Sequence, residues 1–528
     1  MLSFSAATRT ANLARMASDR FDVLVIGGGI TGVGIALDAA ARGYSVALVE
    51  KDDFAAGTSG RSSRLVHGGL RYLEHGEFGL VRESLAERGT LLRLAPHLIR
   101  PVPMYMLADD RRSRVRYRLG LAAYDALAAR RNIGGHRAVN AQRVRAAVPG
   151  LRAWSRGFRY FEGQTDDARL TIEVARTAAA YGAVLANHAR VERLLGGARV
   201  TGAVVTDEIG GQRFEVRAAA TVNACGVWAD GLASVGARLV PSKGIHLVFR
   251  PGAVRTRVAM VLPSAAGDGR YLFVVPWEDR VYAGTTDTPY SGDLDHPAVG
   301  ESDRDYILTA VAADFPGVTE RDVVASWAGL RPLLDQGAGD SRTADLSRRH
   351  AVFEEPPGLF TITGGKLTTY RAMAKDLVDR VQAALGGGGQ CLTQGIPLGL
   401  HGPVAQAVQL ATAEAAALGL PPHVGPRLVQ RYGDDWREAA AMIGRDRSLG
   451  EPAADGLPVL KVELDLARSR EMAITDEDVL VRRTRLSTRD ASIRLPEKLR
   501  PSLPTPSVSF TTPGPILKSL FYCGEFRG

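Results

Sequence analysis

The chain has 528 residues, a formal net charge of +9 and 45% hydrophobic residues, so it is long enough for two or three globular domains. Its three cysteines lie far apart, which excludes a disulfide framework and a cysteine-based metal site and favours a reducing compartment. No apolar run approaches the ~20 residues that cross a bilayer, and no nucleic-acid-binding motif is present, so the positive charge favours a phosphorylated substrate and an anionic membrane surface.

The first 18 residues form an N-terminal extension of basic and small polar character. They carry Arg9 and Arg15, several Ser, Thr and Ala residues, and no acidic residue before Asp19. This composition is compatible with a mitochondrial presequence. The Ala, Gly and Arg richness of the whole chain favours two other interpretations, a disordered extension or a true start at Met16.

A dinucleotide-binding unit is predicted directly after this extension. Residues 21–26 are an apolar, β-branched run typical of a buried parallel strand. The glycines that follow have the G-x-G-x-x-G spacing, which permits a tight turn and lets the backbone approach a pyrophosphate at the start of helix 30–42. A second strand, 44–49, places Glu50 where a carboxylate would bind the adenosine ribose. A glycine-rich turn in an ordinary βαβ unit is the alternative. The three glycines are Gly27, Gly29 and Gly32.

Two segments come next. Residues 52–76 are rich in Gly and Ser and are predicted to form a loop over the cofactor, followed by a helix over 77–94. In residues 109–131, arginines flank an apolar patch at 119–127. Such a segment either lies on lipid with its cations among the headgroups or packs on the protein with a solvated basic face.

The remaining elements predict an α/β protein in which the nucleotide-binding domain is assembled from separate segments. A helix over 169–181 and a strand over 189–194 resume that domain, and the second domain is rich in strands. The predicted boundaries are an extension at 1–18, a nucleotide-binding domain from 19–95, 150–235 and 355–388, a substrate domain from 96–149 and 236–354, a helical cap at 389–490, and a Pro- and Ser-rich disordered tail at 491–528.

Four segments carry side chains suited to a flat redox cofactor and an anionic substrate. Residues 57–73 combine small hydroxyl residues with two glycines, a histidine, an arginine and a tyrosine. Residues 222–230 read as a strand ending in a small-residue turn, and residues 326–333 present an arginine in a turn. Residues 362–371 place two glycines before a helix whose positive end can stabilise a reduced ring.

Together these segments resemble the FAD-dependent glycerol-3-phosphate dehydrogenases, within the glycine-oxidase-like flavoproteins. The resemblance covers about residues 19–490. Arg64 and Cys225 depart from the residues common in the family, and both changes look tolerable. The motifs that carry the resemblance are T-S-x-x-S-S-[KR]-L-[IV]-H-G-G-L-R-Y-L-E-H from Thr58, D-D-A-R-L from Asp166, V-N-A-x-G-x-W from Val222, K-G-x-H from Lys243, G-T-T-D from Gly284, G-x-R-P-L from Gly329 and G-G-K-L-T-T-Y-R from Gly364.

The resemblance implies a Rossmann-like FAD-binding domain, an antiparallel β-rich substrate domain and a helical C-terminal cap. It implies that sn-glycerol 3-phosphate is oxidised at C2 to dihydroxyacetone phosphate, with a hydride passing to FAD and the electrons going on to a membrane quinone. Arg331 is the first choice for the phosphate clamp and Arg71 the second, because a guanidinium fork suits a phosphate.

The other predicted site residues follow from the same motifs. His67 and His246 are both candidates for the base that accepts the C2 hydroxyl proton, and the sequence does not rank them. Lys366 is predicted to contact substrate or flavin, and Tyr72 is predicted either to bind substrate or to pack against neighbouring side chains. No metal site is predicted. The predicted cofactor-binding residues are Gly27, Gly29, Gly32, Glu50, Thr58, Ser59, Ser62, Ser63, Gly68, Gly69, Val191, Ala224, Gly226, Gly364, Gly365, Lys366, Leu367 and Thr368.

Two rival functions remain at this stage. A glycerol-3-phosphate oxidase would share the first half-reaction but use oxygen; such enzymes carry extra sequence in the middle of the chain, which is not found here. A non-catalytic FAD-binding redox protein would not need the arginine, lysine and histidine candidates together. The resemblance also implies a homodimer held on the cytoplasmic face of a bacterial inner membrane, or on the mitochondrial inner membrane if residues 1–18 are a presequence.

Overall fold

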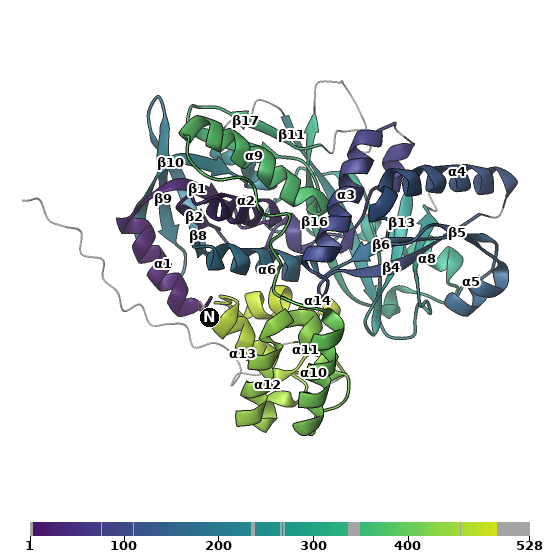
Figure 1. The fold of residues 1–528 in the computed structure, drawn as a ribbon. Helices are drawn as coiled ribbons and strands as arrows, with labels where there is room; N and C mark the ends of the chain where they lie inside the picture. Colours follow the sequence, from purple (N-terminus) through teal and green to yellow (C-terminus); the bar gives the residue numbers. More distant parts are fainter. Residues whose placement is uncertain are drawn as a thin grey trace, which may run out of the picture.

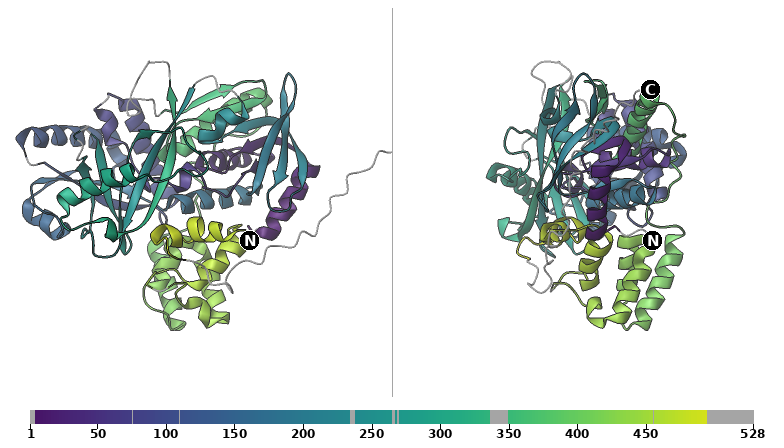
Figure 2. Two further views of the ribbon diagram at one scale, coloured as in Figure 1. Left: turned by 180° about the vertical axis from the view of Figure 1, so that it is seen from behind. Right: turned by 90° about the vertical axis from the view of Figure 1, so that its left-hand side faces the viewer.

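The computed structural model describes residues 4–493 except 75, 109, 234–237, 265–266, 268–269, 336–348 and 455. Two sheets with their helices form the larger part of the molecule, and a bundle of C-terminal helices packs beneath them (Figure 1). The two views in Figure 2 agree that this bundle is a separate unit. The tail predicted to be disordered lies outside the described residues beyond position 493.

The first sheet belongs to the nucleotide-binding domain. Its parallel strands run in the order β18-β10-β1-β2-β7, which is the doubly wound order of a dinucleotide-binding fold. Strand β17 pairs antiparallel with the edge strand β18, and β8 and β9 extend β10 as antiparallel strands. The strands are β1 (Arg20–Ile26), β2 (Val46–Val49), β7 (Val184–Ala186), β8 (Ala189–Gly196), β9 (Val200–Asp207), β10 (Arg213–Asn223), β17 (Ala351–Glu354) and β18 (Leu359–Thr363).

Helices bury the apolar strands of this sheet. Helix α2 begins after the glycine turn that follows β1 and packs against both α6 and α9. A Cβ atom at Gly34 would lie 2.7 Å from the ring of Tyr370, so the approach of α2 to α9 requires glycine there. The predicted βαβ unit is therefore present. The helices are α2 (Ile30–Ala41), α3 (Phe78–Leu94), α6 (Asp167–Ala180) and α9 (Tyr370–Leu385).

The N-terminal extension is folded, so the interpretation of residues 1–18 as disordered is wrong for the described part. Helix α1 (Ala6–Ser18) packs on β7 and β10. The buried guanidinium of Arg9 pairs with Asp207 at 2.5 Å and donates to the carbonyl of Asn187 at 2.8 Å. These contacts were invisible in the sequence because the partners of Arg9 lie almost 200 positions away.

The second sheet is mainly antiparallel and contains more of the chain than predicted. Its order is β15-β11-β14-β13-β12-β4-β6-β3, with β16 on β11 and β5 on β6. Strand β6 pairs along its whole length with β4, so the predicted return of the chain to the nucleotide-binding domain at 150 lies too early. Strand β17 pairs with β18, so residues 351–354, which were predicted to lie in the substrate domain, belong to the first sheet. The strands are β3 (Leu65–Val66), β4 (Arg100–Leu107), β5 (Arg137–Val139), β6 (Gly157–Gln164), β11 (Arg238–Phe249), β12 (Ala259–Pro263), β13 (Tyr271–Trp277), β14 (Arg280–Gly284), β15 (Thr288–Pro289) and β16 (Val323–Asp335).

Three helices accompany this sheet: α4 (Arg111–Ala128), α5 (Ala141–Ala147) and α8 (Glu301–Asp314). The predicted apolar patch at 119–127 is divided between the core and the surface, since Leu121 and Tyr124 are buried in the core whereas Ala122 and Ala126 are exposed. Only Leu119 and the earlier Val115 are exposed as large hydrophobic side chains on α4. The helical periodicity, rather than the run of apolar residues, decides which side chains reach the surface.

The C-terminal bundle is a compact helical cap with its own core. It joins the rest of the molecule through buried arginine–carboxylate pairs, and Glu471 of the cap pairs with Arg169 of α6. Among the described residues, no helix combines the length and the hydropathy that spanning a bilayer requires. The cap helices are α10 (Val404–Ala417), α11 (Val424–Tyr432), α12 (Trp436–Arg445), α13 (Lys461–Arg470) and α14 (Leu486–Arg489).

Candidate active site

A cavity of about 500 Å³ lies between the two sheets, at the carboxyl ends of β1, β2 and β10. Parallel α/β sheets bind their ligands at this edge. All four predicted motif segments contribute to its wall. The predicted residues that line it are Gly27, Gly29, Glu50, Thr58, Ser59, Ser62, Ser63, His67, Tyr72, Val191, Ala224, Gly226, His246, Arg331, Gly364, Gly365, Lys366, Leu367 and Thr368.

Four predicted residues do not line the cavity. A Cβ at Gly32 would lie 1.9 Å from the carbonyl oxygen of Gly27, so this glycine serves the packing of α2 on the turn. The amide of Gly68 donates to the Tyr124 hydroxyl at 2.9 Å, and Gly69 packs against the ring of Tyr72 with a φ of +77°. Arg71, the second choice for the phosphate clamp, is also outside the cavity wall.

One end of the cavity has the features that a dinucleotide requires. The Glu50 carboxylate accepts from the amide of Gly28 at 2.6 Å and from the amide of Asp52 at 2.9 Å, and burial raises its pKa. A Cβ at Gly27, whose φ is +112°, would lie 2.6 Å from the carbonyl oxygen of Ala224. Glycine is therefore required where this turn packs against the end of β10. Gly27, Gly29 and Ile30 line the cavity at the start of α2, where a pyrophosphate would bind, so these residues fit FAD.

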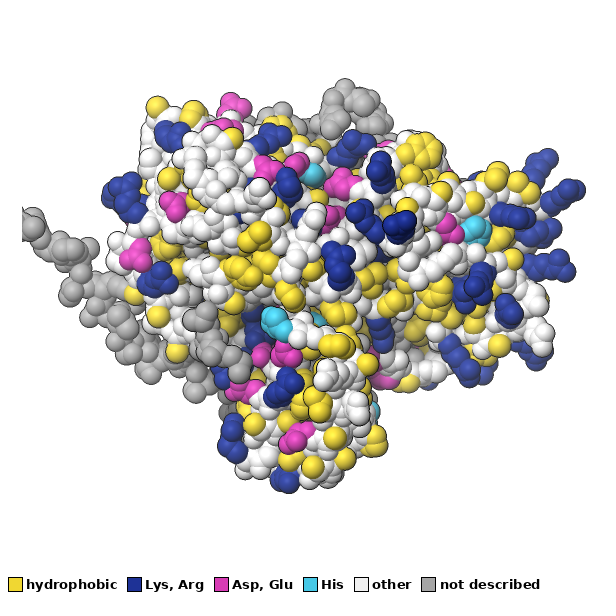
Figure 3. Space-filling model, viewed as in Figure 1, with side chains coloured by type: hydrophobic (Ala, Val, Ile, Leu, Met, Phe, Trp, Pro, Cys, Tyr) yellow, Lys and Arg dark blue, Asp and Glu magenta, His cyan; other side chains and the backbone are white. Residues whose placement is uncertain are grey.

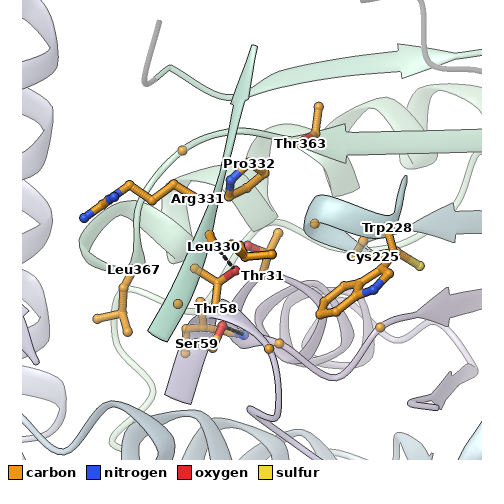
Figure 4. A pocket seen from close by; sticks show the side chains of 18 of the residues that line it. Thr31, Thr58, Ser59, Cys225, Trp228, Leu330, Arg331, Pro332, Thr363 and Leu367 are labelled. Atoms are coloured by element: carbon orange, nitrogen blue, oxygen red, sulfur yellow. Dashed lines mark hydrogen bonds between the residues drawn. The ribbon is translucent and has the colours of Figure 1, made fainter. Parts of the chain in front are cut away.

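The hydroxyl-rich loop is tied to three other elements. Ser59 Oγ accepts from the amide of Ile30 at the start of α2, at 2.9 Å (Figure 4). Thr58 Oγ1 donates to the carbonyl of Leu330 on β16 at 2.6 Å (Figure 4). Ser62 binds Asp167 through its amide at 2.9 Å and its hydroxyl at 2.7 Å. The loop thus connects the dinucleotide end of the cavity with the strand that carries Arg331.

Arg331 lies on the opposite side of the cavity from Trp228 and Cys225 (Figure 4). Its Nη2 donates to Thr285 Oγ1 at 3.0 Å and to the carbonyl of Thr286 at 3.2 Å, and its Nη1 lies 3.6 Å from Asp287. These contacts fix the direction of the guanidinium. They also leave a cation at the cavity wall that is suited to an anionic substrate group.

His246 is buried beside this arginine. Its ring stacks on Trp327 with a centroid distance of 4.7 Å, and its Nε2 lies 2.9 Å from Ser63 Oγ. Burial, followed by the charges of Arg331 and Arg64, lowers the pKa of His246 well below its ordinary value. The imidazole is therefore neutral at physiological pH.

His67 and Lys366 occupy another part of the same wall. His67 is half-buried, and its amide donates to Thr368 Oγ1 at 3.1 Å, which links the loop to the residues that precede α9. The ammonium of Lys366 lies 3.7 Å from the centre of the Tyr72 ring and 3.5 Å from Ser84 Oγ. Tyr72 thus supports the lysine, a role that combines packing with a place on the cavity wall.

Two residues, Trp228 on the cavity wall and Arg64 behind the wall, were not predicted as site residues. The ring of Trp228 packs against Gly57 and has the ammonium of Lys51 at 4.4 Å from its centre. Arg64 is buried behind His246, with its guanidinium 3.6 Å from the centre of the Trp277 ring, and desolvation lowers its pKa to about 10. Trp228 belongs to the recognised V-N-A-x-G-x-W motif, but no local pattern in the sequence marks Arg64 as buried.

A group of acidic and histidine side chains lies outside the cavity. Asp53, His188 and Asp478 come close enough together to hold a cation. The carboxylate of Asp53 already pairs with Arg482 and Arg483, and Asp478 accepts from His188 at 2.9 Å. Because arginines neutralise these carboxylates, the group is a buried ion-pair network rather than a metal site.

Comparison with known proteins extends these observations. Residues 22–380 match the FAD dependent oxidoreductase family, and residues 391–496 match the C-terminal domain of alpha-glycerophosphate oxidase. Glycerol-3-phosphate dehydrogenase 2 of Mycobacterium tuberculosis is 43% identical over 501 residues, covering 91% of this chain and 83% of its own length.

Comparison with solved structures gives the same family and also the fold. The glycerol-3-phosphate dehydrogenase of Bacillus halodurans, complexed with FAD, is 33% identical with a TM-score of 0.76 and covers 93% of this chain and 90% of its own. Glycine oxidase from Geobacillus kaustophilus shares the fold, with a TM-score of 0.55 at 23% identity over 73% of this chain and 100% of its own. The protein is thus an FAD-dependent flavoenzyme with the glycine-oxidase-like fold, and the chain belongs to the family of FAD-dependent glycerol-3-phosphate dehydrogenases.

Proposed function

We propose that this enzyme oxidises sn-glycerol 3-phosphate at C2 to dihydroxyacetone phosphate and passes the two electrons to a membrane quinone. The observation that carries the proposal is the placement of Arg331, Lys366, His67 and His246 on the wall of the cavity that also holds the FAD-binding residues. The names of the Mycobacterium tuberculosis and Bacillus halodurans relatives, both glycerol-3-phosphate dehydrogenases, support the same substrate. FAD, when bound in this cavity, would supply the acceptor for the hydride that leaves C2.

In this mechanism Arg331 binds the substrate phosphate. The guanidinium presents a planar set of donors that matches phosphate oxygens, and its bonds to Thr285 and Thr286 hold it in place before substrate arrives. A Cβ at Gly244 would lie 2.3 Å from Arg331 Nη2, so glycine at this position leaves room for the guanidinium.

The C2 hydroxyl proton goes to a histidine, and His67 suits this step better than His246. A base that accepts a proton becomes a cation, and the two arginines near His246 oppose a third positive charge there. His67 is half-buried on the cavity wall. We assign His67 as the base and His246 as a neutral group that orients the substrate through hydrogen bonding. Lys366 adds positive potential where negative charge develops.

The electron acceptor is tested by an anaerobic reduction followed by two parallel oxidations. Adding sn-glycerol 3-phosphate to the oxidised holoenzyme should bleach the flavin absorbance, and a soluble quinone analogue should restore it much faster than air does. Fast recovery in air would assign the protein to the oxidases instead. Absence of bleaching in a flavin-loaded protein would contradict the substrate and favour a non-catalytic redox role.

We further propose that helix α4 rests on an anionic membrane surface. One face of α4 exposes Val115 and Leu119, at 53% and 66%, together with nearby arginines. Residues at positions i, i+4, i+7 and i+8 share one face of a helix. Lys and Arg side chains gather at the end of the molecule that α4 and α5 form, with few acidic side chains among them (Figure 3). The face comprises Arg111, Arg112, Val115, Arg118 and Leu119.

The double substitution Arg112→Ala/Arg118→Ala should weaken binding to vesicles that contain phosphatidylglycerol by about 10- to 30-fold, since each cation near a membrane contributes about 1 kcal/mol. Binding is measured by vesicle flotation at fixed salt. Arg213→Ala/Arg217→Ala removes the same charge from β10, at the far end of the molecule, and should leave binding unchanged (Figure 1). Equal binding by both double variants would contradict the proposal.

The remaining proposals concern location and assembly. We place the enzyme on the cytoplasmic face of a bacterial inner membrane as a homodimer, because the family resemblance implies both. If residues 1–18 are a presequence, the location is the mitochondrial inner membrane instead. The side chains of Arg9 and Asn12 in α1 donate hydrogen bonds to backbone carbonyls of the nucleotide-binding domain. These bonds support an extension that stays on the folded enzyme.

A further inference from the structure

We propose that Arg485 of the cap is a positioning residue that holds the cofactor loop, residues 57–63, in the shape that binds FAD. Arg485 precedes helix α14 and is 1% exposed, although the loop lies more than 400 positions earlier in the chain. The inference goes beyond the reaction proposed above, since it concerns retention of the cofactor and does not depend on the substrate or the electron acceptor.

A single guanidinium joins the cap to two segments of the nucleotide-binding domain. Arg485 Nη1 donates to the carbonyl of Gly60 in the loop at 2.9 Å. Its Nε donates to Asp166 at 3.0 Å, and its Nη2 pairs with Asp167 at the start of α6. The planar fork of arginine can satisfy acceptors in three directions at once, which the single ammonium of lysine cannot.

Asp167 provides a second, indirect link between Arg485 and the loop. One carboxylate oxygen pairs with Arg485, while the other accepts from both the amide and the hydroxyl of Ser62. Asp167 is fully buried, so its charge depends on these partners rather than on water. Loss of Arg485 would leave a buried carboxylate and a loop carbonyl without their cation.

The residues that Arg485 holds are neighbours of residues on the cofactor cavity. Thr58, Ser59 and Ser62 line that cavity, and Ser59 receives the amide of Ile30 at the start of α2. Gly60, whose carbonyl binds Arg485, lies between them. A shift of the loop at Gly60 and Ser62 therefore moves side chains away from the place where the pyrophosphate of FAD would bind.

The experiment measures release of FAD from diluted holoenzyme by the rise in flavin fluorescence. Arg485→Met should raise the dissociation constant of FAD by about 10- to 100-fold, the equivalent of one charge-assisted hydrogen bond. Arg485→Lys, which retains the charge but not the fork, should give a smaller increase and guards against a misfolded methionine variant. With FAD in excess, the Michaelis constant for glycerol 3-phosphate should stay within about twofold.

Arg427→Met is the matched control, because Arg427 is another buried cap arginine with bonds to Glu463 at 2.7 and 3.0 Å and to Glu278 at 3.2 Å. It makes no bond to the cofactor loop among those that the structure describes. The control should lower thermal stability but keep FAD affinity. Wild-type affinity in both Arg485 variants, or equal weakening in Arg427→Met, would overturn the proposal.

Discussion

His67→Ala is expected to slow reduction of the flavin by glycerol 3-phosphate about 10²- to 10⁴-fold, the usual contribution of a general base. The structure places His67 on the wall of the cofactor cavity, half-buried and close to the segment that contains Lys366 and Thr368. The substituted enzyme should still bind FAD and substrate, because neither the phosphate clamp nor the dinucleotide turn involves this side chain.

His246→Ala should slow the same step less. The imidazole of His246 is enclosed by Trp327 and Ser63, and nearby Arg331 and Arg64 help to keep it neutral. A neutral ring can hydrogen-bond the substrate without taking its proton. Removing it should therefore disturb substrate orientation, with effects on both kcat and the Michaelis constant.

Stopped-flow absorbance under anaerobic conditions measures the step directly, with His401→Ala as the control, since the His401 side chain is 71% exposed on the cap. If His246 were the base, its lowered pKa would put the acid limb of kcat/KM well below pH 6.5, because the ring would lose its proton-accepting form only there. A larger defect in His246→Ala together with such a profile would reverse the two assignments.

The sequence predicted those parts of the site that depend on short-range geometry. The strand, the glycine turn, α2 and Glu50 lie within 31 consecutive positions, 20–50, and the structure has them as predicted. Glycine spacing, an apolar run and a terminal acid are all local consequences of one βαβ unit. The family motifs likewise located Arg331 and Lys366 on the cavity wall.

Features that depend on pairing between distant segments could not be predicted. Strand β6 joins the second sheet because β4 is its partner, and no property of residues 157–164 specifies that choice. Arg71 and Arg331 are equally good phosphate ligands by residue type, but only the folded chain shows that Arg331 lines the cavity. The link from Arg485 to Gly60 spans 425 positions and has no local signal.

Arg331→Ala should raise the Michaelis constant for glycerol 3-phosphate by about 30- to 1,000-fold, the expected cost of removing one partner of a buried charge pair. The rate of flavin reduction at saturating substrate should change much less, because a phosphate clamp binds the ground state and the transition state alike. Steady-state kinetics with a quinone analogue give both quantities.

Arg331→Ala should do more than remove one contact to the phosphate, because a carboxylate lies beside Arg331. Asp287 lies 3.6 Å from Arg331 Nη1 and is largely buried, so in the alanine variant its carboxylate would face the substrate phosphate. Asp287→Asn introduced into Arg331→Ala should therefore recover part of the lost affinity, whereas Asp287→Asn alone should not improve binding.

Arg71→Ala serves as the control for charge. Because Arg71 is absent from the cavity wall, this substitution should leave the Michaelis constant within about twofold of the wild-type value. Arg331→Lys should fall between wild type and Arg331→Ala, since it retains the charge but loses the bidentate fork. A normal Michaelis constant in Arg331→Ala with a large increase in Arg71→Ala would transfer the clamp to Arg71, and would require the loop around Gly69 to move when substrate binds.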